Sequence, residues 1–187
     1  MPSYARRGEG FTRTYDLLED LQNDLKIGHE LLEGNPESQY FRRCVVRAIF
    51  AYLEALIECI KIELRSTIRL KKYACELTKS ELKTLNHLRV ITPVNGKFLP
   101  LEKNIHRTFE LAAKVWGLNF QLSTSNENYK DFLYAKSARN CLTHPKTYYD
   151  IQVTDADMYY HTSTCSWITE EFRRLFKMHM QNIAREG

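Results

Sequence analysis

The sequence predicts an all-α fold, a single helical bundle of about five to six helices around one long central helix. The 187 residues include only 7 glycines and 5 prolines, so residues that break helices are rare. Apolar residues recur every three or four positions through most of the chain, as on the buried face of a helix. The composition, 43% hydrophobic and 27% charged, is typical of a globular domain with a substantial core.

Residues 1–12 are small, basic and glycine-bearing, and we expect a flexible N-terminus there, followed by a single domain over residues 13–187. Leucines at helical spacing predict a first helix over residues 14–33, which Gly34-Asn35-Pro36 should end.

The segment 38–72 contains no glycine or proline and predicts one long helix. Two neighbouring apolar stripes run along it, Val46-Phe50-Leu53-Ile57-Ile60-Leu64 and Val45-Ile49-Tyr52-Leu56-Cys59. A helix that is apolar over so much of its circumference belongs at the centre of a bundle. Glu54 interrupts this surface, and pairing with Arg47 or Lys61 is the simplest explanation for it.

A shorter helix is predicted over residues 73–88. Asn95-Gly96 between two short apolar runs then predicts a small hairpin insertion near residues 90–100. Pro93 and Pro100 would confine this hairpin to an edge, because proline cannot donate a ladder hydrogen bond.

Three more helices complete the predicted bundle. The first covers residues 101–116 and ends at Gly117, and the second covers about 126–142 after the polar turn STSNEN, which supplies a cap. The last opens at Thr154, where Thr154 and Asp157 have the spacing of a capping box, and continues to about residue 181.

Charge, cysteines and histidines narrow the classes of function. A net charge of +4 permits an anionic partner without requiring one. The chain has five cysteines without a C-x-x-C pair, and it lacks an apolar run of about 18 residues, so we expect a cytoplasmic protein that does not enter a membrane. No histidine stands at metal-ligand spacing from another histidine or a cysteine, and no glycine-rich phosphate loop is present, so no metal or cofactor is expected.

The stretch SARNCLTHPK, residues 137–146, contains the strongest candidate site. His144 precedes Pro145, which places it where a helix ends. Arg139 falls on the same helical stripe as Phe132, where a guanidinium needs an ion pair or a cleft. An arginine beside a histidine suits phosphodiester cleavage, since one stabilises charge on the phosphate and the other moves protons. Alternatively, His144 only caps the helix and Arg139 forms a structural ion pair with Glu54.

The motif RNCLTHPK at the end of a late helix, together with the long central helix reading RAIFAYLEALIE, resembles the HEPN superfamily. Its hallmark is an arginine, four to six further residues and a histidine, with a polar residue directly after the arginine. Arg139, Asn140 and His144 occupy these positions with a four-residue spacer. The sharp part of the resemblance covers eight residues, whereas the rest is helix patterning.

The resemblance implies a metal-independent endoribonuclease of toxin or antiviral type that cleaves single-stranded RNA by attack of a ribose 2′-hydroxyl. His144 would move the proton, Arg139 would stabilise the transition state, and Asn140 would orient His144 or the phosphate. Glu54 would support them from the central helix.

The resemblance also implies a homodimer, with two such motifs facing each other, and an antitoxin or regulatory protein as a possible partner. Lys146, Tyr148 and Arg47 are candidate RNA-binding residues, although tyrosines in such a loop also pack on their own domain. Other members of the superfamily are inactive, so a non-catalytic module for dimerisation or for binding a nucleotide or protein is the alternative.

Overall fold

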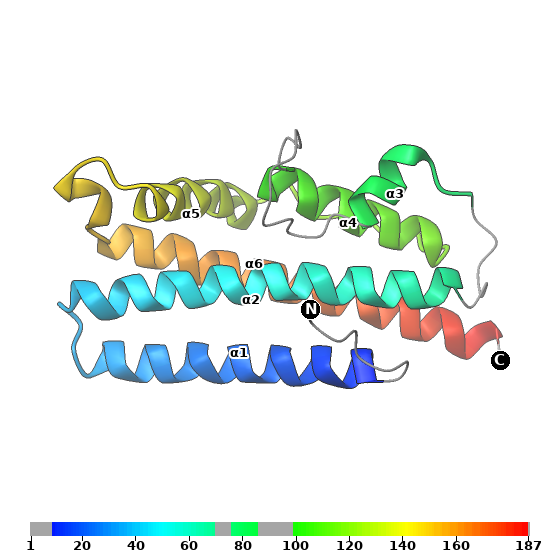
Figure 1. Ribbon diagram of the computed structural model, residues 1–187, viewed down its shortest axis with the longest axis horizontal. Coiled ribbons are helices and arrows are strands. Elements are labelled where there is room, and N and C mark those ends of the chain that lie inside the picture. The colour runs from blue at the N-terminus through cyan, green and yellow to red at the C-terminus, as the bar shows by residue number, and fades with distance from the viewer. Residues whose placement is uncertain (1–8, 70–75, 86–98, 187) are drawn as a thin grey trace, which may run out of the picture. The chain divides into compact units, whose positions relative to one another are not determined.

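The computed structural model describes residues 9–69, 76–85 and 99–186, with side chains described from Tyr15 to Arg185. These residues form six α-helices and one 3-10 helix, and none of them forms a strand (Figure 1). The elements are α1 (Glu9–Glu33), α2 (Gln39–Arg69), α3 (Lys79–Leu85), α4 (Leu101–Val115), α5 (Glu127–Thr143), η1 (Tyr148–Ile151) and α6 (Asp155–Glu186). The predicted all-α fold is therefore confirmed for the described residues. The hairpin predicted near residues 90–100 lies almost entirely outside them.

The chain divides into two compact units. One, called here the site unit, consists of Thr12–Leu56 and Ser123–Phe172, and the other contains Ile57–Leu122 and Arg173–Gly187 together with the first residues of the chain. Helices α2 and α6 contribute residues to both units. The prediction of a single domain remains a prediction.

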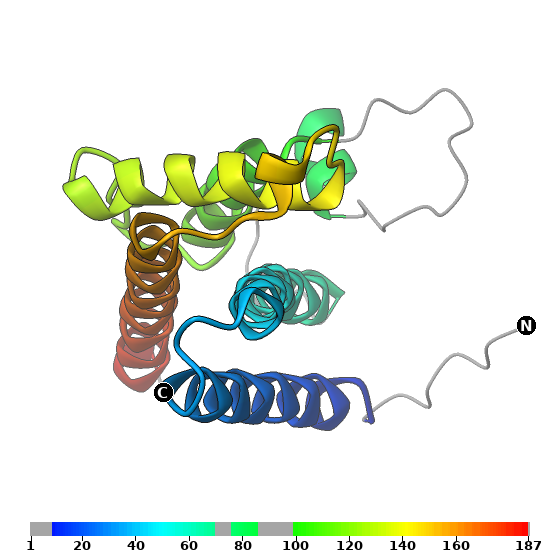
Figure 2. The same cartoon turned by 90° about the vertical axis from the view of Figure 1, so that its left-hand side faces the viewer.

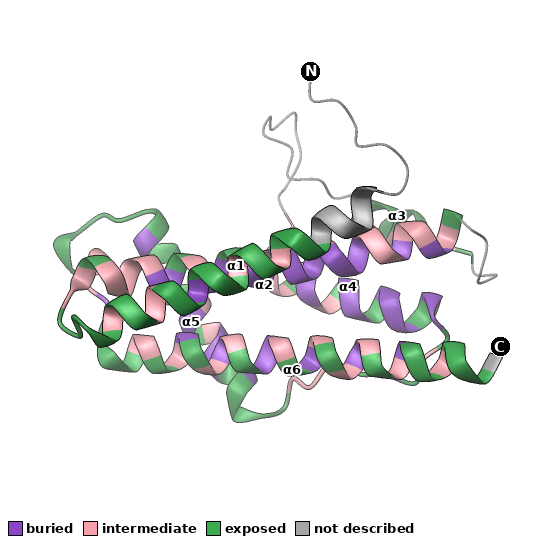
Figure 3. Ribbon diagram, turned by 90° about the horizontal axis from the view of Figure 1, so that it is seen from below, coloured by how far each residue is buried: buried purple, intermediate pink, exposed green. Residues whose placement is uncertain are grey.

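The site unit is built around the first half of α2. Helix α1 runs antiparallel to it (Figures 1 and 2), and Gln22 on α1 donates a hydrogen bond of 2.8 Å to the Tyr52 hydroxyl. Most described residues of α1 are exposed, whereas many residues of α2 are buried (Figure 3). The core of the unit joins three helices through Val46, Ile49, Phe50, Leu53, Phe132, Ala135, Trp167 and Ile168, all of which are buried.

Local capping chemistry sets the helix ends of the site unit. The Asn126 side chain accepts a hydrogen bond of 3.0 Å from the Tyr129 N–H, which caps α5 as predicted. Thr154 and Asp157 form the predicted capping box of α6, with each side chain accepting from the other residue's backbone N–H at 3.1 and 2.9 Å.

The other unit packs around Trp116, which is fully buried at the end of α4. Its ring stacks on His179 of α6, with centroids 4.0 Å apart. Gly117 follows with a φ of +62°, and the hydrogen bond of 2.8 Å from the Leu118 N–H to the Ala113 carbonyl closes the helix. The predicted stop at Gly117 is therefore correct, because glycine adopts this left-handed conformation without strain.

Two helix starts differ from the prediction. Helix α1 begins at Glu9, ahead of the predicted residue 14. Helix α3 begins at Lys79, because Thr78 and Glu81 cap it through reciprocal bonds of 3.2 and 2.6 Å. Residues 76–78 of the predicted helix 73–88 are therefore not helical, and its two ends lie outside the described residues. No helix within the described ranges combines the length and apolar character required to cross a bilayer.

Candidate functional site

Arg139 on α5 is held against α2. Its Nη2 lies 3.1 Å from Glu54 Oε1, and its guanidinium carbon lies 5.5 Å from the centre of the Phe50 ring. The side chains of Arg139 and Glu54 are 31% and 22% exposed, so the ion pair keeps contact with water. Of the alternatives that the sequence left open, the structure supports the Arg139–Glu54 pair, whereas Lys61 binds Glu58 at 2.9 Å.

This ion pair lies in a groove between α2 and α5 with a volume of about 400 Å³. The groove is lined by Val46, Arg47, Phe50, Ala51, Glu54, Arg139, Leu142 and Thr143. The structure thus brings together three residues predicted from the sequence, namely Arg139, Glu54 and Arg47. The groove therefore contains two guanidinium groups and one carboxylate, whereas the Phe50 ring is buried beneath the guanidinium of Arg139.

His144 and Asn140 lie at the exposed carboxyl end of α5. His144 is the C-terminal cap residue, and its backbone N–H donates a hydrogen bond of 3.0 Å to the Asn140 carbonyl. The prediction that the helix stops before Pro145 is confirmed. Asn140 Oδ1 accepts a long hydrogen bond of 3.4 Å from Arg139. The imidazole of His144 is exposed and is not among the lining residues of the groove, although Thr143, directly before it, is.

The segment after His144 is held by its own backbone. Asp150 Oδ2 accepts hydrogen bonds of 2.8 Å from the N–H groups of both Lys146 and Thr147. These two N–H groups hold the pKa of the Asp150 carboxyl below its usual range, that of Lys146 having the larger effect. The side chains of Lys146 and Tyr148 remain exposed, as RNA-binding residues would need to be.

The start of α2 fixes the chain that follows η1. Arg43 donates a hydrogen bond of 3.0 Å to the Ile151 carbonyl, and Arg42 donates one of 3.0 Å to the Val153 carbonyl. Gln39 makes reciprocal bonds with the Val153 backbone at 2.7 and 3.1 Å. These arginines hold the loop after the motif in place.

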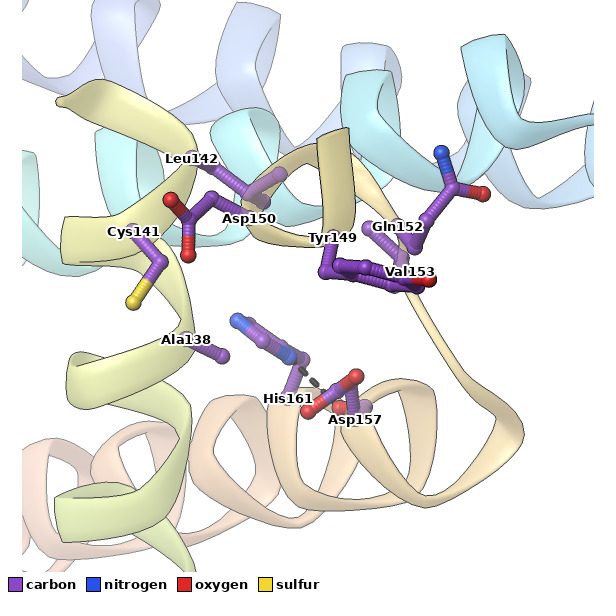
Figure 4. A pocket seen from close by; sticks show the side chains of 9 residues that line it. All are labelled: Ala138, Cys141, Leu142, Tyr149, Asp150, Gln152, Val153, Asp157 and His161. Atoms are coloured by element: carbon purple, nitrogen blue, oxygen red, sulfur yellow. Dashed lines mark hydrogen bonds between the residues drawn. The ribbon is translucent and has the colours of Figure 1, made fainter. Parts of the chain in front are cut away.

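A second cavity, of about 180 Å³, lies between α5, η1 and the start of α6 (Figure 4). Its lining includes Cys141, Tyr149, Asp150, Asp157 and His161. Tyr149 belongs to the loop after His144, whose tyrosines the sequence offered for base stacking, and the other four residues were not predicted as part of a site. The sequence did contain one indication of the ordered turn beside this cavity. Thr147 and Asp150 have the same spacing as the capping box predicted at Thr154, and they form a capping box at the start of η1.

His161 forms the floor of this second cavity and is fully buried. Its Nδ1 lies 2.5 Å from the Asp157 carbonyl oxygen, which can only accept, so Nδ1 carries a proton. Burial lowers the pKa of His161, and hydrogen bonds to the backbones of Asp157 and Ala135 act against this shift. Nε2 is also buried.

Within the described ranges, no group of three His, Cys, Asp or Glu side chains is arranged to hold a metal ion. Comparison with protein families, curated proteins and solved structures finds no match to this chain. The groove and the second cavity are therefore interpreted from their own chemistry.

Proposed function

We propose that the protein is a metal-independent endoribonuclease of HEPN type that cleaves single-stranded RNA at the carboxyl end of α5. The observation that supports this most directly is the guanidinium of Arg139, which Glu54 and Phe50 hold in an open groove. Thr143, which directly precedes the exposed His144, lines the same groove. A fixed guanidinium is preorganised to stabilise negative charge that develops on a phosphate, because it needs little reorientation during the reaction.

The proposed reaction uses the ribose of the substrate as the nucleophile. His144 removes the proton from the 2′-hydroxyl, and the 2′-oxygen attacks the adjacent phosphorus. Arg139 binds the phosphate oxygens as their charge increases, and Asn140 orients the phosphate or the imidazole. The bond from phosphorus to the 5′-oxygen breaks, and this oxygen takes up a proton. The products are a 2′,3′-cyclic phosphate and a 5′-hydroxyl.

We further propose that the working form is a homodimer in which two such chain ends face each other. This arrangement would bring the exposed His144 of a second copy to the groove, which His144 of the same chain does not line. Arg47 in the groove and the exposed Lys146 and Tyr148 would then bind the RNA on either side of the phosphate. A toxin or antiviral role, with an antitoxin or other regulatory protein to restrain the activity, would fit a ribonuclease of this kind.

The test is cleavage of a labelled single-stranded RNA in the presence of a chelator. His144→Ala and Arg139→Ala should each lower the rate at least about 100-fold, in line with the loss of a general base or of a charge-stabilising group. A substrate with a single 2′-deoxynucleotide on the 5′ side of the cleaved bond should not be cut there, because it lacks the nucleophile.

His29→Ala and Arg173→Ala provide matched controls, since they remove the same residue types and neither residue lines either cavity. Mixing the Arg139→Ala chain with the His144→Ala chain should restore part of the activity if the two groups act across a dimer. Cleavage that survives both single substitutions, or that also occurs at the 2′-deoxy position, would refute the proposed reaction.

The engagement of Arg139 by Glu54 also favours a second candidate, a non-catalytic helical module. In such a module the ion pair at 3.1 Å only joins α5 to α2, and the groove binds a nucleotide or a protein segment. This candidate predicts that RNA is not cleaved and that Arg139→Ala lowers thermal stability without changing RNA binding.

A further inference from the structure

Helix α1 leaves one row of side chains open to solvent. Within the site unit it is the outermost helix, with α2 between it and α5 (Figures 1 and 2). The row, called here the α1 row, consists of Leu17, Asp20, Asp24, Ile27 and Leu31, which are separated by 3, 4, 3 and 4 residues. All five are exposed, and the three apolar side chains are 48%, 45% and 46% exposed. This spacing places one side chain per turn on a single line, as in the seam of a coiled coil.

The contact between α1 and α2 uses mainly other positions. Leu25 is the buried residue of α1, and Gly28 lies so close to α2 that a Cβ there would meet Val45 at 3.3 Å. Single exposed apolar side chains are common on protein surfaces. An apolar line edged by polar groups is more typical of a surface where another protein binds.

The length and the pattern of the α1 row fit a second helix laid alongside. From residue 17 to residue 31 the row extends about 21 Å, because each residue of an α-helix rises 1.5 Å. Apolar residues occupy both ends of the row, and Asp20 and Asp24 occupy two positions between them. A carboxylate that loses water against an apolar side chain is costly, so a facing helix needs cations opposite these two positions.

The two aspartates also disfavour a second copy of the chain as the occupant. In a parallel pair of α1 rows, Asp20 would face Asp20 and Asp24 would face Asp24. In an antiparallel pair centred on the row, Asp24 would still face Asp24. Like charges brought together across an interface are unfavourable, and polar residues in a seam select the partner in this way.

Nucleic acid is an equally poor occupant of this surface. Residues 9–33, which form α1, contain seven acidic and two basic residues and have a net charge of −5, whereas the whole chain has +4. A helix with this charge repels phosphates and attracts basic partners.

We propose that the α1 row is a docking surface for a helix of another protein, one that carries lysine or arginine at two inner positions and apolar residues at both ends of its contact line. Helix α2 separates this surface from α5, so the proposal does not depend on the reaction at the groove.

The probe is a synthetic peptide that covers the row and is held helical by a side-chain lactam. It carries leucine at the three positions that face Leu17, Ile27 and Leu31, and lysine at the two that face Asp20 and Asp24. Its Kd, measured by fluorescence anisotropy, should be at least about tenfold lower than that of the same peptide with glutamate at those two positions.

Three double variants test which residues carry this preference. Asp20→Lys with Asp24→Lys should reverse the order of the two peptides. Leu17→Gln with Leu31→Gln should weaken binding of the lysine peptide by about tenfold, because it removes apolar contact area. The matched control is Glu19→Lys with Glu33→Lys, which changes the net charge equally at exposed positions outside the row and should leave the order unchanged. Far-ultraviolet circular dichroism establishes that each variant keeps its helices.

Equal Kd values for the two peptides, or a reversal in the control variant, would overturn the proposal. Sedimentation velocity of the protein alone should give the same oligomeric state for the aspartate variant and the unchanged chain. A change of that state would assign the row to a second copy. An affinity for single-stranded RNA that the aspartate variant alters more than the control does would assign the row to RNA, and either result would overturn the proposal.

Discussion

The ion pair between Arg139 and Glu54 should couple α5 to α2 by a measurable free energy. The two residues are 85 positions apart in the chain, and their charged atoms lie 3.1 Å apart. Replacing Glu54 by Gln removes the negative charge and retains the shape of the side chain. We expect Glu54→Gln to destabilise the fold, because the guanidinium that lies over Phe50 then has lost its counter-charge.

The magnitude follows from the separation and the exposure of the pair. At 3.1 Å, Coulomb's law with an effective dielectric constant of about 20 gives an attraction of about 5 kcal/mol. Lost hydration offsets most of this attraction, because neither side chain is more than 31% exposed. We expect a net coupling of about 1–2 kcal/mol, between the values of about 0–1 for exposed pairs and about 3–5 for the loss of one partner from a fully buried pair.

The assay is a double-mutant cycle with Glu54→Gln, Arg139→Gln and the double variant, each unfolded in urea. The cycle isolates the pairwise energy from the other contacts that each residue makes. Glu127 and Lys130 on α5 serve as the control, since their side chains are 80% and 59% exposed and solvent should screen most of their attraction.

Raising the salt concentration to about 1 M should abolish the coupling of the control pair and only reduce that of Arg139 with Glu54. A coupling for the Arg139–Glu54 pair no larger than that of the control would show that the guanidinium is not fixed. The reasoning that makes it a preorganised phosphate-binding group would then be wrong.

Three further predictions concern stability and reactivity. Burial lowers the pKa of His161 below 6.5, so on acidification the unfolded chain takes up a proton at a higher pH than the folded chain does. The free energy of unfolding should therefore fall by up to about 1.4 kcal/mol per pH unit as the pH drops below about 6.5. Between pH 7.5 and 5.5, urea unfolding should show a smaller decrease in this free energy for His161→Phe than for the unchanged protein, and an equal decrease would contradict the burial argument. Burial raises the pKa of the Cys59 thiol to about 11, whereas the Cys141 thiol is exposed. Iodoacetamide at pH 8 should therefore modify Cys141 well before Cys59. Mass spectrometry of the peptides would measure both rates, and equal rates would contradict the prediction. Gly117→Ala should cost about 1 kcal/mol in urea unfolding because alanine is strained at a φ of +62°, and an unchanged midpoint would contradict that conformation.

Most of the secondary structure could be predicted because its causes are local. Apolar spacing defines the helices, and caps such as Asn126 and the pair Thr154–Asp157 define where two of them start. His144 ends α5 because Pro145 follows it, which is a property of two adjacent residues. The two helix starts that differ, at Glu9 and Lys79, show the limit of apolar spacing, which does not identify the first residue of a helix.

The candidate residues could be found from the sequence, but which of their possible partners they contact could not be decided. For Glu54, the spacing left Arg47, Lys61 and Arg139 as possible partners, because all three lie within reach under some packing of the helices. The choice of Arg139 depends on how α5 packs against α2, and no local pattern encodes that packing.

The sequence by itself determined that the chain is helical, where most of its helices end, and that an arginine, an asparagine and a histidine gather at the end of α5. These follow from propensity, periodicity and capping, which act over a few residues. Only the tertiary structure decided that Arg139 is held by Glu54 in a groove, and that Asp150 and His161 line one cavity. The physical reason is that these arrangements depend on long-range packing, which fixes the distances between side chains that are far apart in the chain.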